Sequence, residues 1–279
     1  MSRRILICTD LDGTLIPDGR APESPSARER FARVVARSEV TLAYVTGRHQ
    51  ALVEEAIVGF SLPVPQIVIA DVGATIYDID QGSWRSWKSW ESKLAEQWDT
   101  GTAKELIMFL PEQFAGLRAQ EASKQAEFKV SFYLESGTDS REILANVRDR
   151  LVRLETPARS IFSRDSMGIG LLDLLPPAAG KLSAIEFLME QRGFRPEGTV
   201  FSGDSGNDLE VLASRLPSVL VANAGAEVQA QARETAAAKG HSEALYIARG
   251  GLLGMNANYA AGILEGLVHF LPETSDWVR

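Results

Sequence analysis

Three short apolar runs in this chain each end abruptly at a polar cluster, and this feature limits the fold more than any other. The runs cover residues 4–9, 40–45 and 199–202, and apolar and polar residues do not alternate within them. Unbroken runs of this length are typical of strands buried on both faces of a parallel sheet. Segments with apolar residues at helical spacing lie between the runs, so the alternation of strand and helix predicts a doubly wound α/β sheet.

A different texture interrupts this pattern between residues 83 and 173. Four of the five tryptophans lie near its start, and two helix-like and two strand-like segments follow. The sequence therefore predicts a small α+β module, which we call the cap, inserted at residues 83–173 of a core formed by residues 1–82 and 174–279. Core and cap should face each other across a cleft.

The bulk composition is that of an ordinary globular protein of 279 residues. Its formal net charge of −8, from 29 basic and 37 acidic residues, argues against nucleic acid as a partner. Cys8 is the single cysteine, so an internal disulfide is excluded and a reducing compartment fits. The apolar run after Arg4 is too short for a signal peptide, and we find no stretch of the roughly 18 apolar residues that a membrane span needs. We therefore expect a cytoplasmic protein that binds neither membranes nor nucleic acid.

Two carboxylates follow the first run, in the segment Asp10-Leu11-Asp12-Gly13-Thr14. Alternate residues at an extended strand end project toward one region, and Gly13 lets the backbone turn sharply. One carboxylate can attack phosphorus, while the other can protonate the leaving oxygen and then activate water. Two carboxylates this close repel each other unless a cation lies between them, which indicates Mg²⁺. A bare Asp-x-Asp is usually a surface or capping pair, but the buried strand leading into this one favours catalysis.

Three further polar clusters follow the same logic. Thr46 and Gly47 come after the second run, where a hydroxyl and free backbone N–H groups can seat a phosphate. Lys181 begins a predicted helix and can place a positive charge beside that phosphate. Residues 203–208, Gly-Asp-Ser-Gly-Asn-Asp, offer oxygen ligands for Mg²⁺. Taken singly, each cluster has an ordinary structural interpretation: an N-cap for residues 46–47, a solvated side chain for Lys181, and an acidic turn for residues 203–208. Because ligands bind at the carboxyl ends of parallel strands, we expect the clusters to meet there.

The order and spacing of these clusters resemble the four motifs of the haloacid dehalogenase superfamily. Their Rossmann-like core carries Asp-x-Asp-Gly-Thr, a hydroxyl residue after the second strand, a lysine, and Gly-Asp-x-x-x-Asp. The position of the insert resembles the C2-type cap class. Beyond these motifs, the chain is similar to sucrose-phosphate phosphatases and related bacterial sugar-phosphate phosphatases. This narrower resemblance lies in Lys129–Phe132, Asp173–Pro176, Asn223–Ala224 and the tail at 260–270.

The resemblance implies a Mg²⁺-dependent phosphatase that acts through an aspartyl-phosphate. Asp10 would be the nucleophile and Asp12 the general acid/base. Thr46, Gly47 and Lys181 would bind the phosphate.

The resemblance also implies a metal site and a sugar site. Mg²⁺ would be held by the Asp10 and Asp204 carboxylates and the Asp12 carbonyl, with Asn207 and Asp208 supporting them. The substrate would be sucrose 6-phosphate or a related disaccharide phosphate such as mannosylfructose phosphate, and a sugar-phosphate synthase is a candidate partner enzyme. The residues at the positions expected to contact the sugar are Arg48, Gln50, Lys129 and Asn223.

Several alternatives remain open at this point. The same core also serves phosphosugar mutases, which return the phosphoryl group to another hydroxyl, and non-catalytic phosphatase-like domains. Lys129 is equally consistent with an exposed edge-strand lysine. The tryptophans at 84, 87 and 90 recur every third residue and could stack on a sugar ring, although packing within the cap is the simpler interpretation. His49, beside Thr46, is a weaker candidate for a ligand contact.

Overall fold

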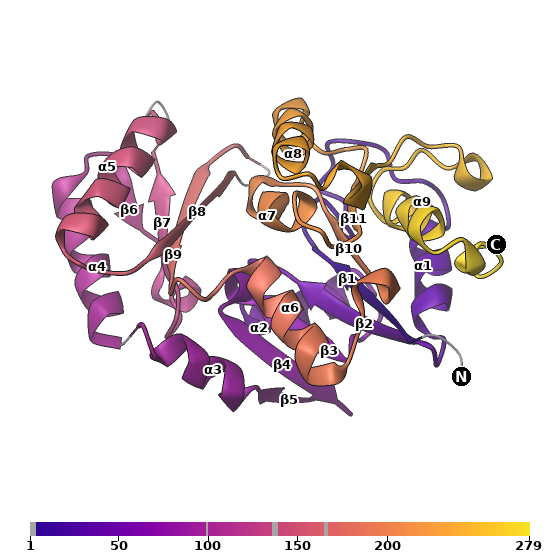
Figure 1. The fold of residues 1–279 in the computed structure, drawn as a ribbon, viewed down its shortest axis with the longest axis horizontal. Helices are drawn as coiled ribbons and strands as arrows, with labels where there is room; N and C mark the ends of the chain where they lie inside the picture. The colour runs from indigo at the N-terminus through magenta and orange to yellow at the C-terminus, as the bar shows by residue number, and fades with distance from the viewer. Residues whose placement is uncertain (1–3, 99, 136–138, 165–166) are drawn as a thin grey trace.

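The computed structural model describes residues 4–98, 100–135, 139–164 and 167–279. Two sheets organise it (Figure 1). The larger has eight strands in the order β12-β11-β10-β1-β2-β3-β4-β5. Neighbouring strands from β12 to β3 are parallel, while β4 and β5 add an antiparallel edge. The strands are β1 (Ile5–Thr9), β2 (Val40–Val45), β3 (Ile67–Ala70), β4 (Thr75–Asp80), β5 (Ser83–Ser86), β10 (Thr199–Gly203), β11 (Ser218–Leu220) and β12 (Leu245–Ile247).

Helices cover both faces of the large sheet, which explains why its central strands are apolar throughout. Ile5 and Ile7 of β1 belong to one apolar cluster, and Leu6 and Cys8 belong to the other. The first cluster contains α1 (Ala27–Val35), α2 (Gln50–Gly59) and α9 (Ala260–Phe270), and the second contains α3 (Lys88–Ala95), α6 (Lys181–Arg192), α7 (Leu209–Leu212) and α8 (Ala226–Ala238). The predicted doubly wound α/β core is confirmed.

The smaller sheet is antiparallel throughout and has the order β6-β7-β9-β8. Figure 1 shows two helices on the side of this sheet that faces away from the large sheet. The elements are α4 (Thr100–Gln113), β6 (Leu117–Ala119), β7 (Val130–Leu134), α5 (Ser140–Arg153), β8 (Arg159–Arg164) and β9 (Gly170–Leu175). The two strands that the sequence predicts in this module correspond to β7 and β8. The structure contains two further strands, β6, which is only three residues long, and β9, which is an apolar run.

Sheet pairing gives the limits of the cap a physical basis. β5, at residues 83–86, pairs with β4 at the edge of the large sheet, and α3 packs on α6 through the Trp90 and Phe187 rings. At the other end, β9 stays in the small sheet as far as Leu175. The first residues of the expected cap thus pack with the core, and β9 extends two residues past the expected end at 173. We therefore propose that the cap runs from about residue 96 to residue 175.

Short 3₁₀ helices complete the chain. One of them, η1 (Asp71–Gly73), follows β3 directly, and another, η4 (Gly206–Asp208), is separated from the end of β10 by two residues. The others are η2 (Ala122–Lys124), η3 (Pro196–Gly198), η5 (Ser242–Ala244), η6 (Leu252–Gly254) and η7 (Pro272–Thr274). Within the described part of the chain, every helix is too short or too polar to cross a bilayer.

Candidate active site

A cleft of about 920 Å³ lies between the carboxyl ends of the central strands and the cap sheet. Residues after β1, β2 and β10 form its core side, as expected for an open parallel sheet. Its cap side is formed by residues of β6, β7, β8 and β9. The predicted residues that line it are Asp10, Asp12, Thr46, Gly47, Arg48, His49, Lys129, Asp204 and Asn207.

Asp10 lies at the end of β1 and is almost fully buried. Its Oδ1 is 3.3 Å from the Nζ of Lys181, the first residue of α6. Burial raises the pKa of Asp10 well above its usual value; Lys181 opposes this shift, while Asp208 and Asp204 add to it. Burial alone would lower the pKa of Lys181, but Asp10 and Asp208 raise it, so the lysine carries a positive charge. The structure thus brings together a carboxylate that lines the cleft and a buried ammonium that lies outside the cleft lining.

Asp204 approaches Asp10 from β10, the neighbouring strand. Its Oδ1 accepts a hydrogen bond of 2.8 Å from Thr14 Oγ1. Burial, reinforced by Asp208, raises the pKa of Asp204 to about 7. Gly13 has φ +73°, and a Cβ there would lie 2.3 Å from Asp204 Oδ2. Only glycine therefore lets the turn after β1 pass so close to this carboxylate.

Asp208 is fully buried, and its two oxygens have different partners. Oδ1 accepts a hydrogen bond from Lys181 Nζ at 2.7 Å, and Oδ2 accepts bonds from the backbone N–H groups of Asp204 and Ser205. Lys181 also donates to Asn207 Oδ1 at 2.8 Å. Asp208 and Asn207 therefore hold the turn after β10 and the lysine in place.

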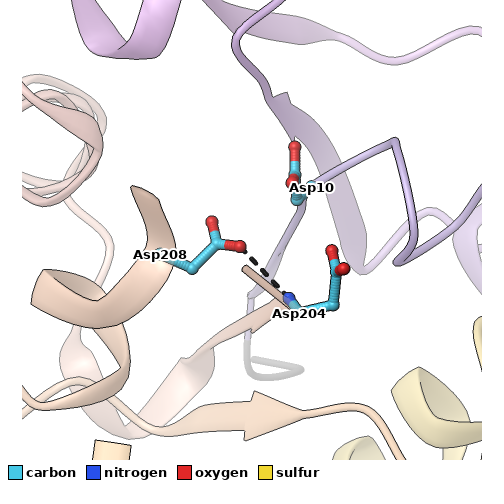
Figure 2. Close-up of side chains that lie close together, drawn as sticks. All are labelled: Asp10, Asp204 and Asp208. Atoms are coloured by element: carbon cyan, nitrogen blue, oxygen red, sulfur yellow. Dashed lines mark hydrogen bonds between the residues drawn. The ribbon is translucent and has the colours of Figure 1, made fainter. Parts of the chain in front are cut away.

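The carboxylates of Asp10, Asp204 and Asp208 form a group that fits a divalent cation. Their ligand atoms lie within 4.8 Å of one another, and Figure 2 shows the three side chains around one small region. Three buried carboxylates face one buried ammonium, that of Lys181, so the group has an excess of negative charge. Burial is the main cause of the raised pKa values of Asp10 and Asp204, and the neighbouring carboxylates raise them further. Carboxylate oxygens are the ligands that Mg²⁺ prefers.

Asp12 lies outside this group, at the wall of the cleft, with its side chain 56% exposed. It accepts two hydrogen bonds of 2.7 Å from Arg48, from Nε to Oδ2 and from Nη2 to Oδ1. Arg48 Nη1 also donates to Leu52 O at 3.0 Å. This arginine, expected to contact the sugar, thus contacts the expected general acid/base.

The predicted phosphate seat is well ordered by the backbone around it. Thr46 is buried, its Oγ1 accepts a hydrogen bond from Arg48 N at 3.2 Å, and its carbonyl accepts one from Val72 N at 3.0 Å. Gly47 lines the cleft beside it. The seat lies on the core side of the cleft, as Asp10 does.

The remaining predicted sugar contacts behave in three different ways. The Gln50 side chain donates to Glu54 Oε1 at 2.9 Å, one turn along α2, and lies outside the cleft lining. Asn223 is also outside the lining; it donates to Gly13 O at 2.6 Å and fixes the turn after β1. Lys129 lines the cleft but is 4% exposed, so the edge-strand alternative is wrong.

Sequence reasoning missed several side chains at the site. Arg20 reaches 3.6 Å from Asp204 Oδ2 and is paired with Asp18. Asp71 and Asp173 are buried acids on either side of the domain junction. Arg20 lies in a loop without periodic pattern, so no sequence signal identified it. Asp71 and Asp173 each interrupt an apolar run, and a charge in such a run is a signal that could have identified them.

The tryptophans lie outside the cleft lining. Trp90 is fully buried, donates from Nε1 to Gly73 O at 3.1 Å, and packs on Phe187 of α6. Trp87 also packs edge-on against Phe187, while Trp84 packs against Tyr77 of β4. In this structure the tryptophans at 84, 87 and 90 therefore pack on the core, and their proposed stacking on a sugar has no support from their positions.

Comparisons with known proteins agree with this geometry. Residues 3–271 match the family described as sucrose-6F-phosphate phosphohydrolase. A Nitrosococcus oceani protein named as a HAD-like hydrolase is 45% identical over 284 residues, which cover 100% of this chain and 75% of that protein. Sucrose-phosphatase 1 of Nicotiana tabacum is 31% identical over 274 residues, which cover 96% of this chain but only 59% of the tobacco protein.

A solved structure extends the agreement to the whole fold. The crystal structure of sucrose-phosphatase from Synechocystis sp. PCC6803 in complex with sucrose and phosphate superposes with a TM-score of 0.79 at 25% identity. The similarity covers 96% of this chain and 98% of that one. The chain therefore belongs to the sucrose-6F-phosphate phosphohydrolase family, and with it to the phosphatases of the haloacid dehalogenase superfamily.

Proposed function

We propose that this chain hydrolyses a disaccharide phosphate, sucrose 6-phosphate or a close relative such as mannosylfructose phosphate, with Mg²⁺ and through a phospho-aspartate on Asp10. The observation that carries the proposal is the contact between Asp10 and Lys181 beside Asp204, at the base of a cleft walled by the cap. The volume of that cleft, about 920 Å³, is within the range that small-molecule sites occupy.

The chemistry follows from the placement of these side chains. A carboxylate oxygen of Asp10 forms a bond to phosphorus while the bond from phosphorus to the sugar oxygen breaks. Asp12 gives its proton to the departing sugar oxygen, then takes one from the water that attacks the phospho-aspartate and releases phosphate. Lys181, the hydroxyl of Thr46 and the N–H group of Gly47 offset the charge on the phosphoryl oxygens. Mg²⁺, held by Asp10, Asp204 and the Asp12 carbonyl, would neutralise further charge at this point.

Two alternatives have less support. A non-catalytic domain would be expected to have lost key residues, whereas the residues of all four motifs are present and lie together. A phosphosugar mutase shares the core residues, and transfer to a sugar hydroxyl would be seen as an isomeric sugar phosphate in place of free phosphate. A sugar-phosphate synthase as partner enzyme stays a prediction.

The test measures kcat/KM for phosphate release in the presence of Mg²⁺ from five substrates. They are sucrose 6-phosphate, mannosylfructose phosphate, glucose 6-phosphate, fructose 6-phosphate and p-nitrophenyl phosphate. We expect kcat/KM for one disaccharide phosphate to exceed that for the monosaccharides by at least about tenfold, or ~1.4 kcal/mol. Asp10→Asn is the control for contaminating phosphatase. A flat profile would overturn the disaccharide specificity, and accumulation of an isomeric sugar phosphate would favour the mutase.

A further inference from the structure

A buried ion pair joins the cap to the core at the edge of the cleft. Lys129, just before β7, places its Nζ 2.9 Å from Oδ1 of Asp71, the first residue of η1. Both side chains are only 5% exposed. A charge buried this deeply is tolerated only with a partner, so each residue fixes the other.

Lys129 also contacts the phosphate seat. Its Nζ is 3.4 Å from Gly47 O, which makes this ammonium a direct link between the cap and the loop that follows β2. Among the described residues, its Nζ has Gly47 O as hydrogen-bond acceptor and Asp71 Oδ1 as ion-pair partner, and its side chain lines the cleft. A third N–H group is therefore left for a ligand that enters the cleft.

The backbone conformation of Asp71 and Val72, on the core side, fixes the position of Asp71. Asp71 and Val72 have φ of +53° and +58°, a left-handed conformation that is uncommon for residues other than glycine. Asp71 N donates to Arg48 O at 3.1 Å, and Val72 N donates to Thr46 O at 3.0 Å. Strained residues of this kind are kept where the surrounding structure determines their position. The backbone of Asp71 is thus tied to the same 46–48 segment that forms the phosphate seat, and a substitution of its side chain leaves these bonds in place.

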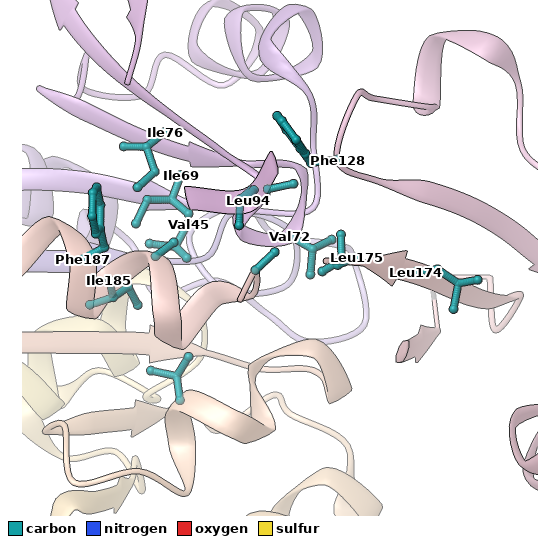
Figure 3. Packing of buried hydrophobic residues seen from close by; sticks show 14 of the residues in the cluster. Val45, Ile69, Val72, Ile76, Leu94, Phe128, Leu174, Leu175, Ile185 and Phe187 are labelled. Carbon is teal, nitrogen blue, oxygen red and sulfur yellow. The ribbon is translucent and has the colours of Figure 1, made fainter. Parts of the chain in front are cut away.

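Buried side chains of the cap also restrict the position of Lys129. Asp173 of β9 accepts a hydrogen bond from Ser131 Oγ at 2.5 Å, and burial raises the pKa of Asp173 while Lys129 opposes the shift. Figure 3 shows Val72, Phe128 and Leu175 in the apolar cluster that crosses from core to cap. Electrostatic interactions are stronger in such apolar surroundings than in water, which favours a fixed geometry for Lys129.

We propose that Asp71 is a positioning residue that holds Lys129 between the phosphate seat and the cap, so that this lysine contacts the sugar part of the substrate. The proposal rests on the proposed function, because it assigns a role within the same cleft. It predicts that Asp71 affects discrimination between substrates and leaves phosphoryl transfer itself intact.

The experiment compares Asp71→Asn, Lys129→Met and the double variant with wild type on two substrates. One is the preferred disaccharide phosphate, and the other is p-nitrophenyl phosphate, which is too short to reach the cap. Asparagine is chosen because it accepts a left-handed backbone more readily than most residues. Asp78→Asn is the matched control, since Asp78 on β4 pairs with Arg192 away from the cleft.

We expect Asp71→Asn and Lys129→Met each to lower kcat/KM for the disaccharide phosphate by at least about tenfold, and to change that for the aryl phosphate less than about threefold. The double variant should be no worse than Lys129→Met alone, because both substitutions remove the same interaction. Equal losses on the two substrates, or a double loss equal to the product of the single ones, would overturn the proposal.

Folding of the single variants is checked by thermal unfolding. If Asp71→Asn does not fold, the double variant, which removes both buried charges together, is measured instead. Wild-type discrimination in that variant would overturn the proposal, and lost discrimination with retained aryl phosphatase activity would support it. The failures are distinguishable: a wild-type enzyme without disaccharide preference contradicts the proposed function, whereas a preference that survives Asp71→Asn contradicts only the role of Asp71.

Discussion

The guanidinium of Arg48 donates two hydrogen bonds of 2.7 Å to the carboxylate of Asp12, one to each oxygen. Asp12 is the expected general acid/base, and both of its oxygens are engaged by this pair. At least one oxygen must be released before Asp12 can exchange a proton with the leaving group or with water. Arg48 also donates to Leu52 O, so the position of Asp12 is linked to the first turns of α2.

Substitution of Arg48 by alanine should therefore affect proton transfer more than folding. The pair is partly exposed, so its contribution to stability is only about 0.2–1 kcal/mol. We expect kcat for a disaccharide phosphate to fall by about tenfold because Asp12 loses its orientation, and kcat for p-nitrophenyl phosphate to fall less, since that leaving group needs little proton assistance. Arg48→Lys should be intermediate because lysine cannot make the paired contact.

Steady-state kinetics on the two substrates measure this difference. Arg85→Ala is a matched control, because Arg85 forms an exposed pair with Asp80 on β4 and β5, outside the cleft lining. An unchanged kcat on both substrates would show that Arg48 has no part in catalysis.

Asp10 and Asp12 should be separable by the step that each one performs. Asp10→Asn removes the attacking oxygen, so no phospho-enzyme should form and turnover should cease. Asp12→Asn should lower turnover of the sugar phosphate by roughly 10²- to 10⁴-fold, the usual range for loss of general acid/base catalysis. With p-nitrophenyl phosphate, the Asp12 variant should still release a burst of nitrophenol, because only the second step is slow.

Rapid-quench measurement of the burst and of acid-stable phospho-enzyme checks both variants. Near-normal kcat in Asp10→Asn would disprove the covalent mechanism.

The core elements could be predicted because their sequence signal is local. An apolar run such as 40–45, buried on both faces, leaves little choice of structure, and β2 begins and ends at the predicted residues. The clusters after β1, β2 and β10 met at one edge because parallel strands direct their carboxyl ends there. Lys181 was placed by its position at a helix start, and the structure finds it there.

The contacts across the domain junction could not be predicted in the same way. Whether Lys129 is exposed depends on Asp71, which is distant in sequence and lies in η1, after a strand of the large sheet, and nothing local to either residue signals their pairing. The Trp-rich texture of residues 83–98 predicts a segment of the cap, whereas Trp90 packs on α6, a helix that the chain forms only after the cap.

Trp90 should be a principal anchor of α3 on the core. Its ring is fully buried against Phe187, and its Nε1 donates to Gly73 O. We expect Trp90→Ala to lower the free energy of unfolding by about 3–5 kcal/mol through lost burial and a cavity. Trp90→Phe should cost less, since it keeps the ring and leaves one carbonyl without its donor, at about 1–3 kcal/mol.

Urea unfolding of the two variants provides the free energies. Trp84→Ala serves as control, because that side chain is only partly buried and packs edge-on against Tyr77. A loss below about 1 kcal/mol for Trp90→Ala would place the anchor of α3 elsewhere.

Removal of the metal should abolish turnover and make stability depend on pH. EDTA should stop phosphate release, and added Mg²⁺ should restore it, because Asp10, Asp204 and Asp208 carry more negative charge than Lys181 can offset. Full turnover after verified metal removal would contradict the metal assignment.

The pH dependence follows from the raised pKa of Asp204, which burial and Asp208 move from 3.8 to about 7. The folded, metal-free protein binds this proton more tightly than the unfolded chain does, so the free energy of unfolding falls as pH rises between those two values. Asp10 shifts in the same direction. Bound Mg²⁺ stabilises the ionised carboxylates, so the gain in Tm on adding it should be larger at pH 8 than at pH 5.5. Thermal unfolding with and without Mg²⁺ at the two pH values measures this, and Asp204→Asn should remove most of the gain. An equal gain at both pH values would mean that the metal does not bind at Asp204.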